Sequence, residues 1–216
     1  MSPFEVTGAA HPAQGLLSLM AHDLRTPLGP LGLAVTSVAQ SESAPQAVRE
    51  LGTMAEAQGT RLARLIDATL AASGRAPYLR VQATTCSQIV EAARERFDAL
   101  GGLVEADVED TGLACDAERI RDAILGLMEV ATGEGGHAML RAGPAGGNAL
   151  FRIPVRDVDA CREALVAPFV CSAASAFALG ALAVLRLHEG GLELTDEGFI
   201  AWLPRAAAVA EFDPGW

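Results

Sequence analysis

A histidine, a carboxylate and a hydroxyl lie close together near the start of this 216-residue chain: His22, Asp23 and Thr26. A neutral imidazole is a nucleophile near neutral pH and can accept a phosphoryl group. Asp23 can hydrogen-bond the ring and raise its basicity. On a helix, Thr26 lies one turn along the same side, where its hydroxyl can position a water or a phosphoryl oxygen. The spacing indicates a phosphoryl-accepting histidine; the alternative is an ordinary exposed histidine.

The surrounding pattern predicts two helices that position this group. Apolar or small residues recur in alternating steps of three and four, which is a heptad seam. They fall at Leu17, Ala21, Leu24, Leu28, Leu31, Val35 and Val38, and again at Val48, Leu51, Ala55, Gln58, Leu62, Leu65 and Thr69. Turn residues at 40–45 separate the two runs, so residues 13–74 are predicted to form an antiparallel helical hairpin.

His22 falls beside the seam, on a flank that another protein can reach. Pro27 removes one helical hydrogen bond and should loosen the helix near the histidine. A lone hairpin leaves its apolar stripe half covered, and pairing with a second copy into a four-helix bundle covers it. The pattern therefore predicts a homodimer through this domain.

Short strands and amphipathic helices are predicted after residue 77. The expected strands are 78–84, 103–108, 138–142, 149–155, 192–195 and 198–203, and the expected helices are 86–100, 116–132 and 173–188. Asp116 is the expected N-cap of the second helix, and the glycine-rich stretch 143–147 is expected to be a flexible loop. Strands on one side and helices on the other make an α/β sandwich over residues 78–204, so the fold class is α+β.

The composition excludes several functions. All 16 basic residues are arginines, against 27 acidic residues, and the net charge is −11. An acidic protein repels nucleic acid and anionic membranes, and a chain without lysine has no phosphate-loop lysine or Schiff base. The four cysteines lack metal-site spacing, so we expect no metal site and a reducing compartment. No export signal or bilayer-length apolar run is visible, so the expected location is the cytoplasm.

Residues 22–28, His-Asp-Leu-Arg-Thr-Pro-Leu, resemble the phosphoacceptor box of sensor histidine kinases without a break. The resemblance implies that His22 is the phosphoacceptor, Asp23 the acidic base and Thr26 the polar residue that governs hydrolysis. Residues 116–131 and 178–204 resemble parts of the GHKL-type ATP-binding domain of the same kinases. The stretch around His188 resembles a stretch of that domain whose histidine has a structural role. We expect structural or incidental roles for His188, His11 and His137.

The residues that bind ATP in that family are missing. Val130 stands where the family has an asparagine that coordinates magnesium and phosphates, and the chain's only asparagine, Asn148, lies outside this helix. Residues 157–161 lack both glycines of the adenine-binding D-x-G-x-G, and residues 178–182 keep one glycine of the phosphate loop. Backbone amides approach phosphates closely only where glycines permit it. We therefore expect no bound cofactor and a degenerate ATPase-like domain.

The predicted function is that of a histidine phosphotransferase, resembling dimeric phosphotransferases of bacterial phosphorelays. His22 would take a phosphoryl group from a receiver-domain aspartate and pass it to another response regulator, with magnesium on the receiver. A hybrid histidine kinase is a further possible partner. The expected docking flank includes Arg25, Gly29 and Leu33. The first alternative is a non-catalytic pseudokinase that binds and regulates a response regulator or kinase; a weaker one is an active ATP-dependent sensor kinase core.

Overall fold

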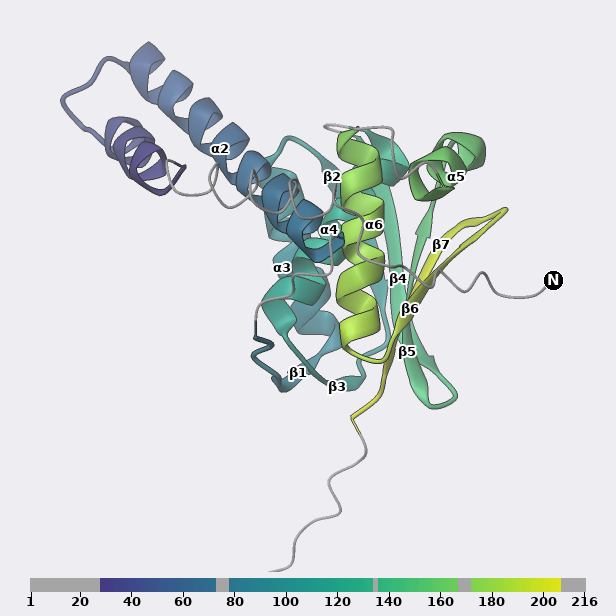
Figure 1. Ribbon diagram of the computed structural model, residues 1–216. Coiled ribbons are helices and arrows are strands. Elements are labelled where there is room, and N and C mark those ends of the chain that lie inside the picture. The colour runs from purple at the N-terminus through teal and green to yellow at the C-terminus, as the bar shows by residue number, and fades with distance from the viewer. Residues whose placement is uncertain (1–27, 73–77, 134–135, 167–171, 207–216) are drawn as a thin grey trace, which may run out of the picture. The chain divides into compact units, whose positions relative to one another are not determined.

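The computed structural model describes residues 28–72, 78–133, 136–166 and 172–206 of a chain that divides into two compact units, residues 1–75 and 76–216 (Figure 1). His22, Asp23, Arg25 and Thr26 lie outside the described residues. Each unit is considered by itself below.

The first unit is a helical hairpin. A helix over residues 28–39 and helix α2 (Gln46–Ala72) are joined by turns at 40–45. The helices lie close together at Gly52, where a Cβ atom would lie 2.9 Å from the backbone nitrogen of Ala39. One turn along α2, the Thr36 hydroxyl donates to Glu56 Oε1 at 2.7 Å. The absence of a side chain at Gly52 therefore lets the two backbones approach.

The second unit is built on a five-stranded mixed sheet with a two-stranded sheet at its side. The order of the large sheet is β2 (Leu103–Val108), β4 (His137–Ala145), β5 (Asn148–Pro154), β7 (Gly198–Pro204), β6 (Gly191–Thr195). Only β2 and β4 pair in parallel within this sheet. The small sheet pairs β1 (Gln82–Thr85) with β3 (Gly112–Cys115) in antiparallel fashion.

Four helices lie in the described residues of this unit, and helices cover one face of the large sheet (Figure 1). They are α3 (Cys86–Ala99), α4 (Ala117–Thr132), α5 (Val158–Val166) and α6 (Ala173–Leu187). Helices α3, α4 and α6 contact the strands, and α5 packs against α6 and strand β6. The expected α+β fold class, with helices on one side of a sheet, is confirmed.

Buried and exposed residues alternate along the strands and define the two faces of the sheet. Leu140, Phe151, Ile153 and Leu203 are buried against the helices, whereas the residues between them point to the uncovered face. On the helix side the core includes Phe97 and other fully buried apolar side chains. Burial of this apolar surface is the main force that holds the two layers together.

Several predicted elements are confirmed and others are corrected. Helices α3, α4 and α6 and strand β2 lie where the sequence predicts them, with Asp116 as N-cap of α4. The predicted loop at 143–147 is wrong, because β4 continues to Ala145 and a turn at Gly146 and Gly147 leads into β5. The strand predicted at 78–84 begins only at Gln82, and β3 and α5 are additional elements.

Candidate functional site

The described part of the predicted docking flank is exposed. Gly29 and Leu33 lie one turn apart on the helix over 28–39, and Leu33 is 76% exposed. A Cβ atom added at Gly29 would have no neighbour within 4 Å. These two positions are therefore open to another protein, while the reactive residues predicted at 22–26 lie in the part of the chain that is not described.

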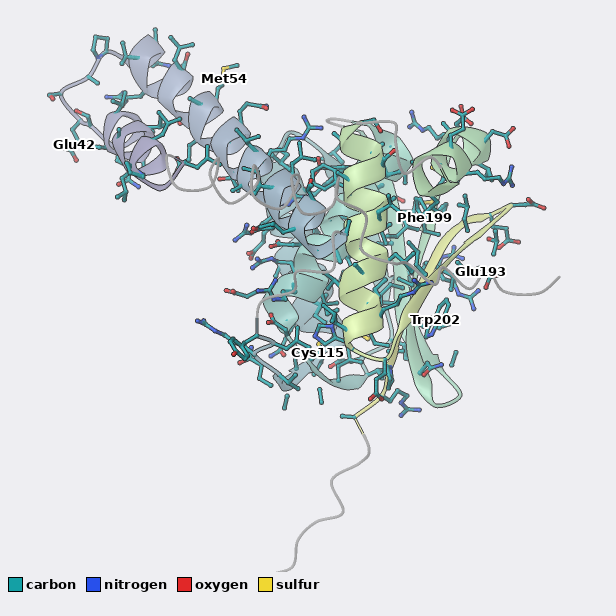
Figure 2. The ribbon with its side chains drawn as sticks, in the orientation of Figure 1. Glu42, Met54, Cys115, Glu193, Phe199 and Trp202 are labelled. Atoms are coloured by element: carbon teal, nitrogen blue, oxygen red, sulfur yellow. The ribbon has the colours of Figure 1, made fainter. Side chains whose placement is uncertain are left out.

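An apolar groove runs along the hairpin between its helices. It is lined by Ala34, Val35, Val38, Val48, Leu51, Gly52 and Ala55. Beside it, Met54 projects from α2 (Figure 2), and Leu51 and Met54 are each 65% exposed. Several predicted seam positions are thus uncovered in one chain. Gly52, which is not one of the predicted seam positions, makes a close contact with the first helix. An isolated glycine within a helical pattern is the signal that could have found it.

The segments that resemble nucleotide loops are helical here. Residues 158–161 belong to α5, whose first turn is capped when Asp157 Oδ1 accepts a hydrogen bond from the Ala160 amide at 2.9 Å. Residues 178–182 lie inside α6, and Ala178 and Gly180 are buried there. The amides of residues 178–182 lie inside α6 and are bonded to its own backbone. Residues 158–161 are the first turn of α5, where the amides of Ala160 and Cys161 bond to the carboxylate and the carbonyl of Asp157.

The C-terminal half of α4 packs against helices α5 and α6. A Cβ atom at Gly126 would lie 3.2 Å from Phe177 Cβ, so α6 lies directly on this glycine. At the position where the family resemblance expects asparagine, the Val130 carbonyl accepts a hydrogen bond from the Cys161 thiol at 3.9 Å. Helices α5 and α6 thus both contact the part of α4 that the resemblance associates with nucleotide phosphates.

His188 joins two helix ends in the buried interior. Its Nε2 accepts a hydrogen bond from the Asp116 amide at 3.0 Å, so Nδ1 carries the proton and donates to the Val184 carbonyl at 2.8 Å. The Asp116 carboxylate in turn accepts from the backbone amides of Arg119 and Arg80, at 3.2 and 3.0 Å. This arrangement fastens the start of α4 to the end of α6, which agrees with a structural role.

The described cysteines are buried free thiols. Burial, with Asp110 adding in the same direction, raises the pKa of Cys86 from its ordinary 9.0 to about 11. Burial, then Asp116 and Cys86, raises the pKa of Cys115 to about 11. Burial and then Asp157 also raise the pKa of Cys161. Within the described ranges, no group of three or more His, Cys, Asp or Glu residues is arranged to hold a metal ion.

The raised pKa values predict a loss of stability in alkali. A folded pKa above the unfolded one means that the fold favours the neutral thiol, so this contribution is complete below pH 9 and is lost between about pH 9 and about 11. The chain has no lysine and one tyrosine, so few other groups titrate there. Urea midpoints measured from pH 8 to 11 should fall, and should fall less in a Cys86→Ala, Cys115→Ala variant. A flat wild-type profile would contradict this.

Comparison with known proteins shows the fold. No protein-family model matches the sequence, and no curated protein matches it either. Among solved structures, the Acinetobacter baumannii histidine kinase AdeS is similar at 17% identity, with a TM-score of 0.53 over 86% of this chain and 98% of that one. This similarity shows that the chain has a histidine kinase-like fold.

Two further solved structures are similar with TM-scores below 0.5. Histidine kinase ThkA in complex with response regulator protein TrrA gives 18% identity and a TM-score of 0.47, over 89% of this chain and 61% of that one. The mycobacterial sensor histidine kinase MprB gives 16% identity and a TM-score of 0.42, over 58% of this chain and 97% of that one. Among the described helices, none is both long enough and apolar enough to cross a bilayer.

Proposed function

We propose that the chain is a cytoplasmic histidine phosphotransferase of a phosphorelay that works without ATP. Residues 13–74 form its phosphotransfer domain and residues 78–204 its degenerate ATPase-like domain. The observation that carries the proposal is that both nucleotide-loop positions lie in helices, α5 and the buried middle of α6. A kinase-like fold whose nucleotide-loop positions are helical and whose sequence lacks the family's asparagine and loop glycines, together with an intact phosphoacceptor box at 22–28, fits transfer better than ATP hydrolysis.

The phosphoryl transfer needs no ATP, because its energy comes from the aspartyl phosphate of the donor receiver domain. His22 attacks the phosphorus of a receiver's aspartyl phosphate through a ring nitrogen lone pair, a nitrogen–phosphorus bond forms, and the aspartate carboxylate leaves. The second transfer reverses these steps onto another receiver. Asp23 holds the ring by accepting its N–H, and Thr26 positions a phosphoryl oxygen or water. Any magnesium requirement belongs to the receiver domain.

Exposure of the hairpin supports docking of a receiver beside His22. Gly29 leaves a gap on the helix surface and Leu33 offers an apolar side chain next to it. Arg25 would add a positive charge to this flank of an otherwise acidic protein. We propose these three residues as partner contacts.

The uncovered groove supports a homodimer that completes a four-helix bundle. Leu51→Glu places a charge among the groove's apolar residues, where an unpaired charge is costly. Light scattering after gel filtration should show a dimer for the wild type and a monomer for the variant. Thr53→Glu, also exposed on α2 but outside the groove, is the control and should remain dimeric. An unchanged mass for Leu51→Glu would contradict the dimer.

Labelled phosphoryl donors test the function directly. We expect the purified chain to take label from a phosphorylated receiver domain and to pass it to a second receiver, and to take none from Mg·ATP. Receiver binding without label would replace the proposal with the pseudokinase alternative. Label from ATP alone would identify an active kinase and overturn the proposal.

A further inference from the structure

Residues 78–81, here called the strap, lead into strand β1 of the second unit. Their side chains are largely exposed, with Tyr78 at 99% and Val81 at 57%. Within the described residues, the strap makes one hydrogen bond, in which the Arg80 backbone amide donates to Asp116 Oδ2 at 3.0 Å. A segment with exposed side chains and so few hydrogen bonds lies at the low end of local stability.

Two donors compete for the carboxylate oxygen that holds the strap. Arg119 Nε lies 3.2 Å from the same Asp116 Oδ2, which is within ion-pair distance. This nitrogen is buried, yet its N–H makes no hydrogen bond with any residue that the structure describes. A buried donor without an aligned acceptor costs free energy. While the Arg80 amide occupies Oδ2, the hydrogen bond from Arg119 Nε is therefore left unmade.

We propose that the strap is a releasable fastening with two states, which differ in the donor that Asp116 Oδ2 accepts. In the fastened state, which the structure shows, the Arg80 amide donates to this oxygen. In the released state the Arg80 amide turns to water and Arg119 Nε donates instead. One hydrogen bond replaces another, so the buried carboxylate keeps a donor in both states. The proposal is independent of phosphotransfer at His22.

The other hydrogen bonds of Asp116 hold in both states. Its Oδ1 accepts from the Arg119 amide at 3.2 Å, which preserves the N-cap of α4. Its own amide donates to His188 Nε2 at 3.0 Å, which keeps the end of α6 in place. Neither bond involves the strap. The strap can therefore open while the two helices stay folded, which is a local opening and not an unfolding of the unit.

Opening of the strap lengthens the connection between the two units. Strand β1 begins at Gln82 and pairs with β3, so the ordered part of the second unit begins there in the released state (Figure 1). The four residues of the strap then belong to the connection and add about 13 Å to it when extended. Partial burial of Leu79 opposes this opening. The exchange of donors at Asp116 thus sets the length of chain between the hairpin and the second unit.

Amide hydrogen exchange tests the fastening at the bond itself. In nitrogen–proton correlation spectra of the full chain, we expect the Arg80 amide to exchange through a local opening whose rate does not change at low urea concentrations. The amide of Ile124, which is fully buried in α4, should exchange through unfolding and faster as urea is added. An Arg80 amide that exchanges only together with the Ile124 amide overturns the proposal.

Removal of the competing donor gives an effect of opposite sign to a loss of stability. Arg119→Leu deletes the hydrogen bond of the released state, so the Arg80 amide should exchange roughly threefold to tenfold more slowly. Arg121→Leu removes an arginine that pairs with Asp122 at 2.9 Å, and as the matched control it should leave the rate unchanged. Unchanged or faster exchange at Arg80 in Arg119→Leu overturns the proposal. The urea series on the wild type decides the question if Arg119→Leu does not fold.

Trypsin gives a second measure of the same opening. The chain has no lysine, so trypsin cuts it after arginines, and the bond between Arg80 and Val81 lies within the strap. Cleavage at this bond, followed by mass spectrometry, should slow in Arg119→Leu and proceed as in the wild type in Arg121→Leu. Equal cleavage rates at this bond in Arg119→Leu and the wild type contradict the exchange of donors.

Discussion

Replacing His22 with alanine is expected to abolish acceptance of a phosphoryl group from a phosphorylated receiver domain. The substitution removes the only imidazole in the box at 22–28. The Thr26 hydroxyl is a weak nucleophile at its ordinary pKa, and a phosphoryl group on the Asp23 carboxylate would be a labile acyl phosphate, so neither replaces His22. The measurement is label retained on the chain after gel separation. Because the bond is a phosphoramidate, we expect the wild-type label to survive alkali and to be lost in acid.

Asp23 and Thr26, beside His22, should affect the rates of phosphoryl transfer and hydrolysis and not whether the chain accepts a phosphoryl group. Asp23→Asn keeps the shape but removes the proton acceptor, so we expect transfer to slow by roughly a hundredfold or more. Thr26→Ala should leave acceptance intact and change how fast the phosphohistidine is hydrolysed. His137→Ala, a control at an exposed histidine that lies 3.1 Å from Glu105, should behave as wild type. Label on His22→Ala equal to wild type would refute the assignment of the acceptor.

Replacing His188 with alanine is expected to give the largest loss of stability in the second unit. The change leaves the Asp116 amide and the Val184 carbonyl without partners in a buried place and opens a cavity between α4 and α6. Each unpaired buried group costs about 1–3 kcal/mol, so the expected loss for the two groups is about 2–6 kcal/mol. Urea unfolding followed by tryptophan fluorescence reports on this unit, because both tryptophans belong to residues 76–216.

A control substitution at another histidine tests whether the loss of stability is specific to His188. His137→Ala removes an exposed pair with Glu105, for which about 0–1 kcal/mol is expected. His188→Gln tests geometry, since its amide can reach one of the two backbone partners and should recover part of the loss. An unchanged urea midpoint in His188→Ala would show that this bridge does not hold the two helix ends together.

The elements that sequence reasoning located share strong local signals. Asp116 caps α4 through a bond to the amide of Arg119, three residues away, and Thr85 caps α3 in the same way with Gln88. Such contacts lie within one turn, so residue type and spacing reveal them. Strand β3 and helix α5 are short and have weak patterns of their own. They form because the β1 pairing and the surface of α6 support them.

In the candidate site, too, some features follow from the local sequence and others from tertiary packing. Residues 22–28 and the heptad seam can be recognised from their order alone, since a helix places neighbours three and four apart on one side. Which seam residues remain exposed depends on how closely the helices approach, and Gly52 against Ala39 sets that distance. The expected glycine-rich loop at 143–147 was wrong because pairing with β5 holds residues up to Ala145 in the strand.

By itself, the sequence determined the main helices, the Asp116 cap, the match of residues 22–28 to a phosphoacceptor box and the loss of the nucleotide-binding residues. Only the tertiary structure decided the parallel pairing of β2 with β4, the bridge from His188 to Asp116 and the hydrogen bond from Arg80 to Asp116. The reason is physical. Helix caps and heptads depend on contacts between residues a few positions apart, whereas strand register and buried bridges depend on packing between segments distant in the chain.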